Sequence, residues 1–374
     1  MTVVLYGATG YTGQLVTEEL VARAVPFVLG GRREQALRAL SASRGNGAEI
    51  RIASVDDPAS MRALMDGCDV VINCAGPFSL AGETVVAAAV DTATHYIDST
   101  GEQPYMQAVF ERHGPAAERA GVALVPAMAF DYVPGDCIAR LAAAELEPLR
   151  ELRLYYAVSG FGATRGTLRS SLEMLKGGDI VYEDGDWAPA PSYVAPERFE
   201  FPAPLGLKSV SKYPSGEIVT VPRHTQTRKV TARITSETFV PSPRLAGAMP
   251  YMTPVISAAL RTPLRGVLHR AINRLPEGPE LEQRRSAAFT VVAVAHAGDG
   301  RTRQGVVRGS DVYGFTSVSL VRAAELMSAP GYSAKGALGP AAAFDPAAFL
   351  DLLAGHGVSW ELESLGAAAS PAAF

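Results

Sequence analysis

Two short segments of the sequence concentrate side chains that can move protons. The first, HYIDSTGE, carries Tyr96, Asp98 and Glu102, and the second, AFDYVPGD, carries Asp131 and Tyr132. Carboxyl groups and phenols act as general acids and bases when their surroundings tune their pKa values. We predict Tyr132 as a proton donor with Asp131 orienting it or a substrate, and Tyr96, on the same strand face as Asp98, as a second candidate donor. For Asp98 and Glu102 the alternative is that they cap or orient the Ser-Thr-Gly turn.

Other polar residues have a structural interpretation that competes with a functional one. Asp136 follows Pro134, which suits a first helical position, so we expect Asp136 to lie in a first turn and to be structural. Thr164, Arg165 and Thr167 open a predicted helix. They either cap it or hold a carbonyl or carboxylate of the substrate.

The glycine-rich turn GATGYTG near the N-terminus has the composition of a phosphate site. An apolar run precedes it, a helix-like stretch follows it, and its G-x-x-G-x-x-G spacing differs by one residue from the dinucleotide fingerprint. Glycines let backbone N–H groups approach a pyrophosphate, and a helix N-terminus adds partial positive charge. The predicted phosphate-binding residues are Gly7, Thr9, Gly10, Tyr11, Thr12 and Gly13.

The segment LGGRR, at the end of the second predicted strand, indicates which dinucleotide binds. An NAD enzyme places Asp or Glu here for the ribose hydroxyls. This chain has Arg32 and Arg33 instead, and an arginine can bind a 2′-phosphate through two hydrogen bonds. The alternative is that both are solvent-exposed residues opening a helix. We predict NADP(H), with Arg32 as the stronger candidate.

The fourth predicted strand ends in the small-residue segment NCAGPF. Ligands of open α/β sheets bind at the carboxyl ends of the strands, so a loop of small residues there suits a bound cofactor. The alternatives are that Asn73 caps the next segment and that Gly-Pro is an ordinary turn. The predicted cofactor contacts are Asn73, Ala75, Gly76 and Pro77.

Six apolar strand segments alternate with helix-like segments over the first 125 residues, which predicts a parallel, Rossmann-type sheet. The strands are expected at Val3–Tyr6, Pro26–Gly30, Glu49–Ala53, Val70–Cys74, His95–Asp98 and Val122–Val125. The helices are expected at Gln14–Ala24, Arg33–Ala42, Pro58–Met65, Gly82–Asp91 and Met106–Ala120.

Beyond residue 150 the pattern changes to longer, often alternating strands, which predicts an α+β domain with a largely antiparallel sheet. Its strands are expected at Leu152–Val158, Ile218–Val221, Lys229–Glu237, Ala287–Ala297 and Arg303–Gly309, with helices at 165–176 and 254–272. Helices at Ser317–Met327 and Pro346–His356 and a strand at Val358–Leu362 follow. We predict an NADP-binding domain over 1–135, a substrate and dimerisation domain over 136–316, and C-terminal helices over 317–374 that return to the first domain.

The composition bounds the class of protein. A chain of 374 residues, 48% hydrophobic and 19% charged, fits a two-domain globular enzyme. A net charge of −4 without a basic cluster argues against a nucleic-acid partner. Three cysteines without metal-ligand spacing predict a cytoplasmic protein with no zinc site. No signal peptide is expected, and the uncharged stretch 245–260, interrupted by Pro250 and Pro254, is too short to span a membrane.

Taken together, the motifs resemble the saccharopine dehydrogenase-like oxidoreductases, in particular the branch of bacterial trans-acting enoyl reductases. The resemblance extends from residue 7 to residue 316 and rests on GATGYTG, LGGR, NCAGPF, YIDSTGE, FDYVPGD, GTLRSSLEML, GPELEQRR and GSDVYGFT. It implies a Rossmann domain joined to an α+β domain, use of NADP(H), and hydride transfer between them. One departure is Ala129, where the family often has glycine.

We therefore predict an NADPH-dependent reductase of an activated C=C or C=N bond. The apolar segment 245–260 favours an apolar or carrier-tethered substrate. One alternative is a saccharopine- or opine-type amine-forming dehydrogenase, whose carboxylate anchors would be Arg165, Arg169, Arg223 and Lys229. The other is a non-catalytic NADP-binding regulator. The extended second sheet offers a surface for a homodimer.

Overall fold

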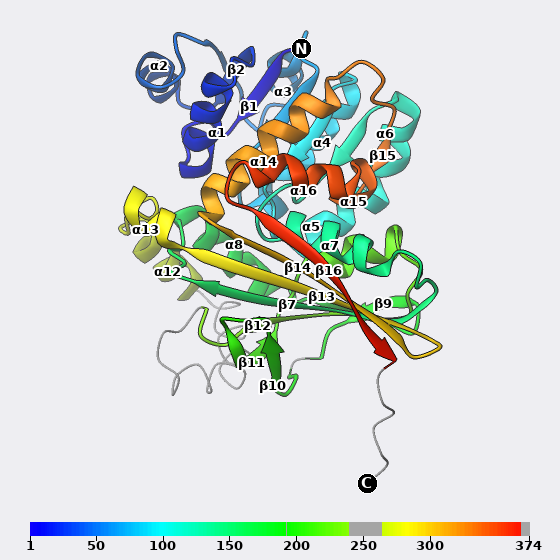
Figure 1. The fold of residues 1–374 in the computed structure, drawn as a ribbon. Coiled ribbons are helices and arrows are strands. Elements are labelled where there is room, and N and C mark those ends of the chain that lie inside the picture. Colours follow the sequence, from blue (N-terminus) through cyan, green and yellow to red (C-terminus); the bar gives the residue numbers. More distant parts are fainter. Residues whose placement is uncertain (192, 239–263, 368–374) are drawn as a thin grey trace.

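A computed structural model describes residues 1–191, 193–238 and 264–367 (Figure 1). It shows two sheets, one above the other in the view of Figure 1, with helices on the upper sheet and between the two. The apolar segment 245–260, which favoured an apolar substrate, lies outside the described residues. That preference therefore rests on the sequence alone.

Seven parallel strands form the first sheet, in the order β15-β6-β5-β4-β1-β2-β3. They are β1 (Val3–Tyr6), β2 (Phe27–Gly31), β3 (Glu49–Ile52), β4 (Val70–Asn73), β5 (His95–Asp98), β6 (Ala123–Val125) and β15 (Gly336–Ala337). Strands β1 and β4 are buried along their whole length because helices cover both faces, which explains their uninterrupted apolar runs. The predicted Rossmann-type sheet is confirmed.

The helices of this sheet begin close to where the sequence places them. They are α1 (Tyr11–Ala22), α2 (Glu34–Ser43), α3 (Pro58–Met65), α4 (Phe78–Asp91), α5 (Gln103–Ala108) and α6 (Gly114–Ala120). The single helix expected over 106–120 is divided, because a π-helical turn, η1 (Val109–His113), separates α5 from α6.

The second sheet is mixed and mostly antiparallel, as predicted. Its main path runs β10-β11-β12-β7-β13-β14-β16, with β8 on β12 and β9 on β8, and only the β12–β7 pairing is parallel among the described strands. The strands are β7 (Leu149–Ser159), β8 (Ile180–Glu183), β9 (Asp186–Pro189), β10 (Glu197–Phe201), β11 (Gly206–Lys212), β12 (Val230–Thr235), β13 (Ala288–Ala297), β14 (Arg301–Ser310) and β16 (Ser359–Ala367).

Two local predictions in this half are wrong. The strand expected at Ile218–Val221 is instead the short helix α9 (Glu217–Thr220) followed by the 3₁₀ turn η2 (Val221–Arg223). A four-residue apolar run does not distinguish a strand from a buried helical turn. Helix α14 (Val312–Met327) begins at Val312 and not at the predicted Ser317, because the Asp311 side chain accepts the backbone N–H of Gly314 and caps the helix.

Further helices lie along the chain before and between the strands of the second sheet. They are α7 (Val133–Ala143), α8 (Arg165–Gly177), α12 (Leu264–Ile272), α13 (Leu281–Ser286), α15 (Pro340–Ala343) and α16 (Pro346–Ala354). Ile97 of β5, Ile138 of α7 and Val291 of β13 belong to one buried apolar cluster, so the two sheets share a core. The boundaries at 135 and 316 remain our proposal for dividing the chain.

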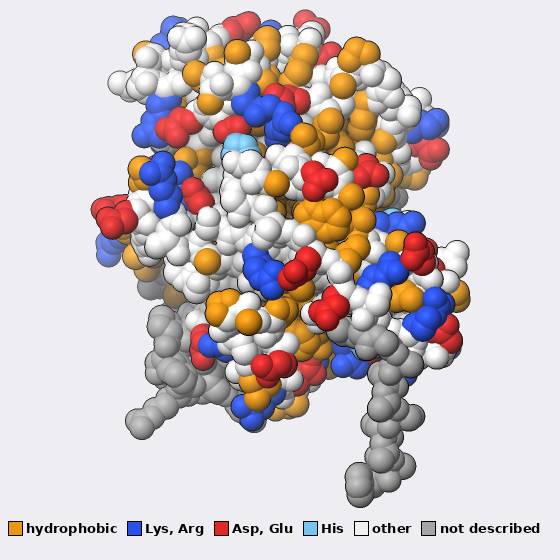
Figure 2. All heavy atoms as spheres, in the orientation of Figure 1, with side chains coloured by type: hydrophobic (Ala, Val, Ile, Leu, Met, Phe, Trp, Pro, Cys, Tyr) orange, Lys and Arg blue, Asp and Glu red, His pale blue; other side chains and the backbone are white. Residues whose placement is uncertain are grey.

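The C-terminal segment contributes to both halves. Helix α14 packs against α1, and β15 pairs with β6 at the edge of the parallel sheet. Strand β16 instead pairs with β14, in the second sheet. On the face drawn in Figure 2, basic and acidic side chains are interspersed. None of the described helices is long and apolar enough to cross a membrane.

Candidate dinucleotide and reaction site

The glycine loop after β1 is built around two close backbone contacts. Gly7 has φ +78°, and a Cβ atom on it would lie 2.7 Å from the backbone nitrogen of Ala75. A Cβ atom on Gly13 would lie 2.4 Å from the carbonyl oxygen of Gly7. A side chain fits at neither position, so these glycines let the loop fold tightly against the NCAGPF turn and the start of α1.

The N-terminus of α1 is open to an anion. Its cap residue, Gly10, has no side chain to accept a hydrogen bond. No acceptor among the described residues takes the backbone N–H groups of Tyr11, Thr12 or Gly13. First-turn N–H groups of this kind bind phosphate oxygens in dinucleotide sites. The predicted phosphate residues therefore fit the pyrophosphate of NADP(H).

The two predicted 2′-phosphate ligands lie at the neighbouring strand end. Arg32 follows β2 directly and is exposed, and it lies close enough to Tyr6 to offset part of the pKa increase that burial causes in that phenol. Arg33 is also exposed, and its Nη2 donates to Oγ1 of Thr9 at 3.3 Å. The guanidinium group of Arg33 thus contacts the glycine loop, and Arg32 lies at the adjoining end of β2.

Replacing Arg32 with alanine is expected to weaken NADPH binding about tenfold or more while leaving NADH binding unchanged, because a charge-assisted, two-hydrogen-bond contact to the 2′-phosphate is lost. Dissociation constants for both dinucleotides, measured by nucleotide fluorescence, check this. Arg33→Ala provides the comparison, and Arg38→Ala, whose side chain pairs with Glu34 on the surface, is the control. An unchanged NADPH/NADH preference in both Arg32→Ala and Arg33→Ala would assign the 2′-phosphate to other residues.

Asn73 shapes the turn after β4 from within the protein. Its Oδ1 accepts the backbone N–H of Ala75 at 3.0 Å, and its Nδ2 donates to the hydroxyl of Tyr96 at 3.0 Å. The side chain is fully buried. These contacts support the capping alternative for Asn73, while the neighbouring Ala75, Gly76 and Pro77 remain predicted cofactor contacts through their backbone position.

Tyr96 and Asp98 belong to a buried hydrogen-bonded network. The Tyr96 hydroxyl donates to Oδ2 of Asp98 at 2.7 Å and lies 2.7 Å from the hydroxyl of Tyr105. Oδ1 of Asp98 accepts the backbone N–H groups of Thr100 and Ala127, both at 2.9 Å. Burial raises the pKa of Asp98 to about 6, against the opposing effect of these hydrogen bonds. With both oxygens occupied, Asp98 ties β5 to the loop after β6.

Glu102 caps a helix that lies far from it in sequence. Its Oε1 and Oε2 accept the first backbone N–H groups of α4, those of Phe78 and Ser79, each at 2.8 Å. Ser170 of α8 also donates to Oε1, at 2.7 Å. Glu102 is 1% exposed, and its carboxylate oxygens are occupied by these hydrogen bonds, so its role here is structural. It orients the turn that carries Gly76 and Pro77.

Asp131 and Tyr132 lie together where the two halves of the molecule meet. A Cβ atom on Gly101 would lie 3.4 Å from the Tyr132 hydroxyl and 3.7 Å from Oδ2 of Asp131. The Tyr132 hydroxyl donates to the carbonyl of Gly101 at 2.7 Å. Asp131 keeps part of its surface exposed, yet the packing around its carboxyl group raises its pKa to about 6. No hydrogen bond or ion pair joins this carboxyl group to another described residue.

Three residues that the sequence did not single out surround this pair. Tyr213 lies next to Tyr132, and the Tyr156 ring lies 5.2 Å from that of Tyr213. The Tyr156 hydroxyl donates to Oε1 of Glu217. Burial raises the pKa of Glu217 to about 8, so it is mostly a neutral acid at pH 7. Tyr156 lies on β7, Tyr213 directly follows β11, and Glu217 begins α9. No local sequence motif marks any of the three.

Asp136 is structural, as expected, but through long-range contacts as well as through the helix dipole. Its carboxylate accepts hydrogen bonds from Thr220, from His224 at 2.9 Å and from the backbone N–H of Ala341 at 2.8 Å. Burial raises its pKa, but His224 and these hydrogen bonds outweigh that effect and hold the pKa below its usual value. Asp136 therefore joins α7 to η2 and α15.

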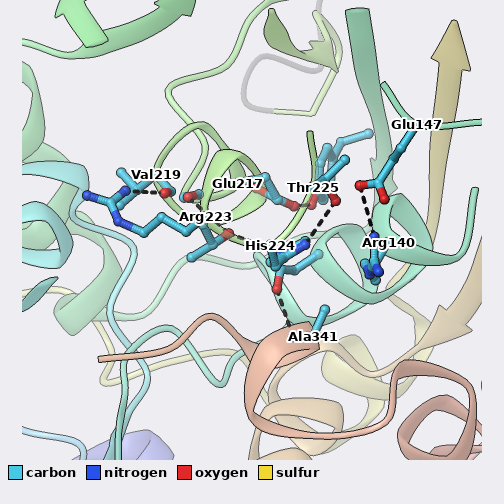
Figure 3. Close-up of polar contacts among 12 residues, drawn as sticks. Arg140, Glu147, Glu217, Val219, Arg223, His224, Thr225 and Ala341 are labelled. Carbon is cyan, nitrogen blue, oxygen red and sulfur yellow. Dashed lines mark hydrogen bonds and ion pairs between the residues drawn. The ribbon is translucent and has the colours of Figure 1, made fainter. Parts of the chain in front are cut away.

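A cavity of about 440 Å³ lies beside this group, lined by residues that include Arg140, Glu147, His224 and Gln226. Arg223, a predicted carboxylate anchor of the amine-forming alternative, also lines it, whereas none of the predicted catalytic or cofactor-binding residues does. Arg140 pairs with Glu147 at 3.0 Å (Figure 3), and the guanidinium group of Arg223 is stacked on two aromatic rings. We therefore do not assign the reaction to this cavity.

The N-terminus of α8 is closed by its own residues and by a tyrosine of α14. Oγ1 of Thr164 accepts the backbone N–H of Thr167 at 3.0 Å. The Tyr313 hydroxyl accepts the backbone N–H of Thr164 at 3.0 Å and lies 3.2 Å from Oγ1 of Thr167. Arg165 pairs with Glu277 at 3.4 Å. The threonines thus cap the helix, which supports the structural alternative.

Comparison with known proteins identifies what these features resemble. Residues 3–127 match the model of the saccharopine dehydrogenase NADP binding domain family. A saccharopine dehydrogenase-like oxidoreductase of Bos taurus is 28% identical over 205 residues, which are 50% of this chain and 44% of the relative. A trans-acting enoyl reductase of Mycobacterium leprae is 33% identical over 139 residues, 36% of this chain and 34% of the relative. The matches thus cover less than half of each relative.

The whole fold has a solved counterpart. Saccharopine dehydrogenase (L-Glu forming) from Saccharomyces cerevisiae superposes with a TM-score of 0.63 over 98% of this chain and all of that one, at 14% sequence identity. At this identity the likeness concerns the fold. The match of residues 3–127 confirms the predicted cofactor, NADP(H), and agrees with the predicted family over that part of the chain.

Proposed function

Residues 3–127 belong to the saccharopine dehydrogenase NADP-binding domain family, and on that premise we propose that the protein is an NADPH-dependent reductase of an activated C=C or C=N bond. The reduction would take place at the carboxyl edge of the parallel sheet. There Gly76, Gly101 and Asp131 lie on the loops that follow β4, β5 and β6. Ligands of open α/β sheets bind at this edge.

The proposal rests above all on the raised pKa of the Asp131 carboxyl group and on its lack of hydrogen-bond partners among the described residues. The surrounding packing raises this pKa to about 6. Perturbed, unpaired acids of this kind are typical of reaction sites. Among the five predicted catalytic residues, Tyr96, Asp98 and Glu102 have their polar groups occupied by structural hydrogen bonds.

NADPH supplies a hydride when bound, and the protein must supply a proton and fix the geometry. We assign the proton to Asp131, because neither oxygen of its carboxyl group has a hydrogen-bond partner among the described residues, whereas Oε1 of the neighbouring Glu217 accepts the Tyr156 hydroxyl. Tyr132 is a positioning residue in this proposal, since its hydroxyl proton is directed at the Gly101 carbonyl. The loop of Gly101 is thereby held beside Asp131. Glu102, through its contacts with Phe78 and Ser79, holds the adjoining turn.

The amine-forming alternative has little support from the charges. A substrate with two carboxylates needs cationic anchors, and the four candidates already contact other groups of the protein. Arg165 and Arg169 both contact Asn273, and Arg165 also pairs with Glu277. Arg223 is stacked between the rings of Phe110 and Trp187, and Lys229 pairs with Glu183. These contacts favour a substrate without paired carboxylates.

The names of the similar proteins are consistent with reduction of either a C=C or a C=N bond. A trans-acting enoyl reductase is among the similar proteins, and so are saccharopine dehydrogenase-like oxidoreductases. A screen of NADPH oxidation at 340 nm with enoyl thioesters, cyclic imines and 2-oxo acids plus amines tests the proposal. We expect oxidation with an enoyl thioester or an imine, whereas oxidation only with a 2-oxo acid and an amine would favour the amine-forming alternative.

A further inference from the structure

The motif GPELEQRR, which the proposed reaction does not use, lies against the glycine loop. We define residues 277–286, which include α13, as the strap. The Tyr11 hydroxyl in the glycine loop donates to the carbonyl of Pro279 at 2.7 Å. A Cβ atom on Gly278 would lie 2.6 Å from the Tyr11 ring, so the strap backbone rests directly on that ring.

The strap is not held by the apolar core. Helix α13 has no buried residue, and Leu281 is 51% exposed. An isolated six-residue helix is not stable on its own, so other contacts must fix it. Among the described residues these contacts include the Tyr11 hydroxyl with the Pro279 carbonyl and the ion pair of Arg165 with Glu277. They also include Arg284, whose Nε lies 2.9 Å from Oδ1 of Asp311.

These contacts join the strap to the glycine loop, to α8 and to the cap of α14. Arg165 begins α8, and its backbone N–H donates to the carbonyl of Glu277 at 3.1 Å. Asp311 caps α14. The Tyr11 ring also packs edge-on against Tyr313 of α14, with ring centroids 5.2 Å apart, and the Tyr313 hydroxyl accepts the backbone N–H of Thr164. The strap and the Tyr11–Tyr313 pair therefore connect the phosphate loop to the start of α8.

We infer that the strap is a second-domain element of the NADP(H) site, which holds Tyr11 and the glycine loop in the phosphate-binding conformation and couples cofactor binding to α8. Tyr11 is a positioning residue in this role. Its hydroxyl is directed at Pro279, and the open backbone N–H groups of the same helical turn remain for the phosphates. Because the strap has few apolar contacts, its order depends on the loop beneath it.

Two variants test the inference, with the full-length protein and no substrate. Tyr11→Phe removes one hydrogen bond and is expected to raise the Kd for NADPH about three- to tenfold. Gly278→Ala forces the strap away from the Tyr11 ring and is expected to raise this Kd about tenfold or more. Gly278 lies outside the glycine loop, so an effect there isolates the strap. The controls are Gly298→Ala, where a Cβ has open space, and Tyr332→Phe, whose hydroxyl has no partner among the described residues.

Amide hydrogen exchange supplies a second readout that a merely structural role would not move. In the wild type, NADPH is expected to slow exchange in residues 277–286 and at the start of α8, and this protection is lost in Gly278→Ala. An unchanged Kd in both variants, or unprotected strap amides in the NADPH-bound wild type, would overturn the inference. Because neither measurement uses a substrate, a protein that binds NADPH this way but reduces nothing would contradict only the proposed function.

Discussion

Replacing Asp131 with asparagine reduces kcat by about 10²- to 10⁴-fold, the usual contribution of a general acid, and leaves the Kd for NADPH unchanged. The amide has a similar shape but no transferable carboxyl proton. The pH dependence follows from the same group. The donor must be protonated, and burial raises its pKa to about 6, so wild-type kcat falls as the pH rises through about 6. The residual activity of Asp131→Asn lacks this decline.

The control for this variant is Asp91→Asn, which changes a surface carboxylate that pairs with Arg62 at 3.4 Å. Surface pairs of this kind contribute about 0–1 kcal/mol, so its kcat and pH profile should match the wild type. Tyr132→Phe distinguishes the two candidate donors. A large loss of kcat in Tyr132→Phe together with near-normal turnover in Asp131→Asn would transfer the proton to the tyrosine and refute our assignment.

Gly13→Ala raises the Kd for NADPH about 100-fold, because the added methyl group cannot be accommodated without moving the loop. Its Cβ would lie 2.4 Å from the carbonyl oxygen of Gly7 and 2.7 Å from that of Ala8. Both are backbone atoms, which cannot rotate away as a side chain can. The phosphate-binding turn must then shift, and the N–H groups of Tyr11 and Thr12 lose their alignment with the phosphates.

Gly355→Ala is the matched control, because a Cβ there meets nothing within 4 Å. Fluorescence titration with NADPH measures the affinity, and thermal melting without ligand reports whether the variant remains folded. An NADPH affinity within about twofold of the wild type in a folded Gly13→Ala protein would show that the phosphates bind elsewhere.

The parallel sheet was predictable because its constraints are local. Strands β1 and β5 have the predicted bounds, and β1 is apolar throughout because it is buried on both faces. The glycine loop was predictable for the same reason: its tight turn and its helix lie within one short segment. In contrast, the apolar run at 218–221 carried no periodicity, and its helical form depends on how it packs against other elements.

The polar residues of the site were only partly predictable. Because side chains alternate along a strand, the sequence predicts that Tyr96 and Asp98 lie on the same face. In the structure the Tyr96 hydroxyl donates to the Asp98 carboxylate. The sequence does not reveal that Glu102 caps α4, whose first residue lies 24 positions earlier. Nor does it reveal the contact of Tyr11 with Pro279, 268 positions later. Such long-range contacts decide which carboxyl groups are occupied and which, like that of Asp131, are unoccupied.

Transfer of deuterium from NADPH labelled at C4 of the nicotinamide tests the central claim most directly. The labelled cofactor is incubated with the protein and each acceptor of the panel, and the products are examined by mass spectrometry. Our account predicts one deuterium on a carbon of a reduced enoyl thioester or imine, with its rate reduced by the stated factor in Asp131→Asn. Tight binding of NADPH with no deuterium transferred to any acceptor would contradict it and favour a non-catalytic regulator.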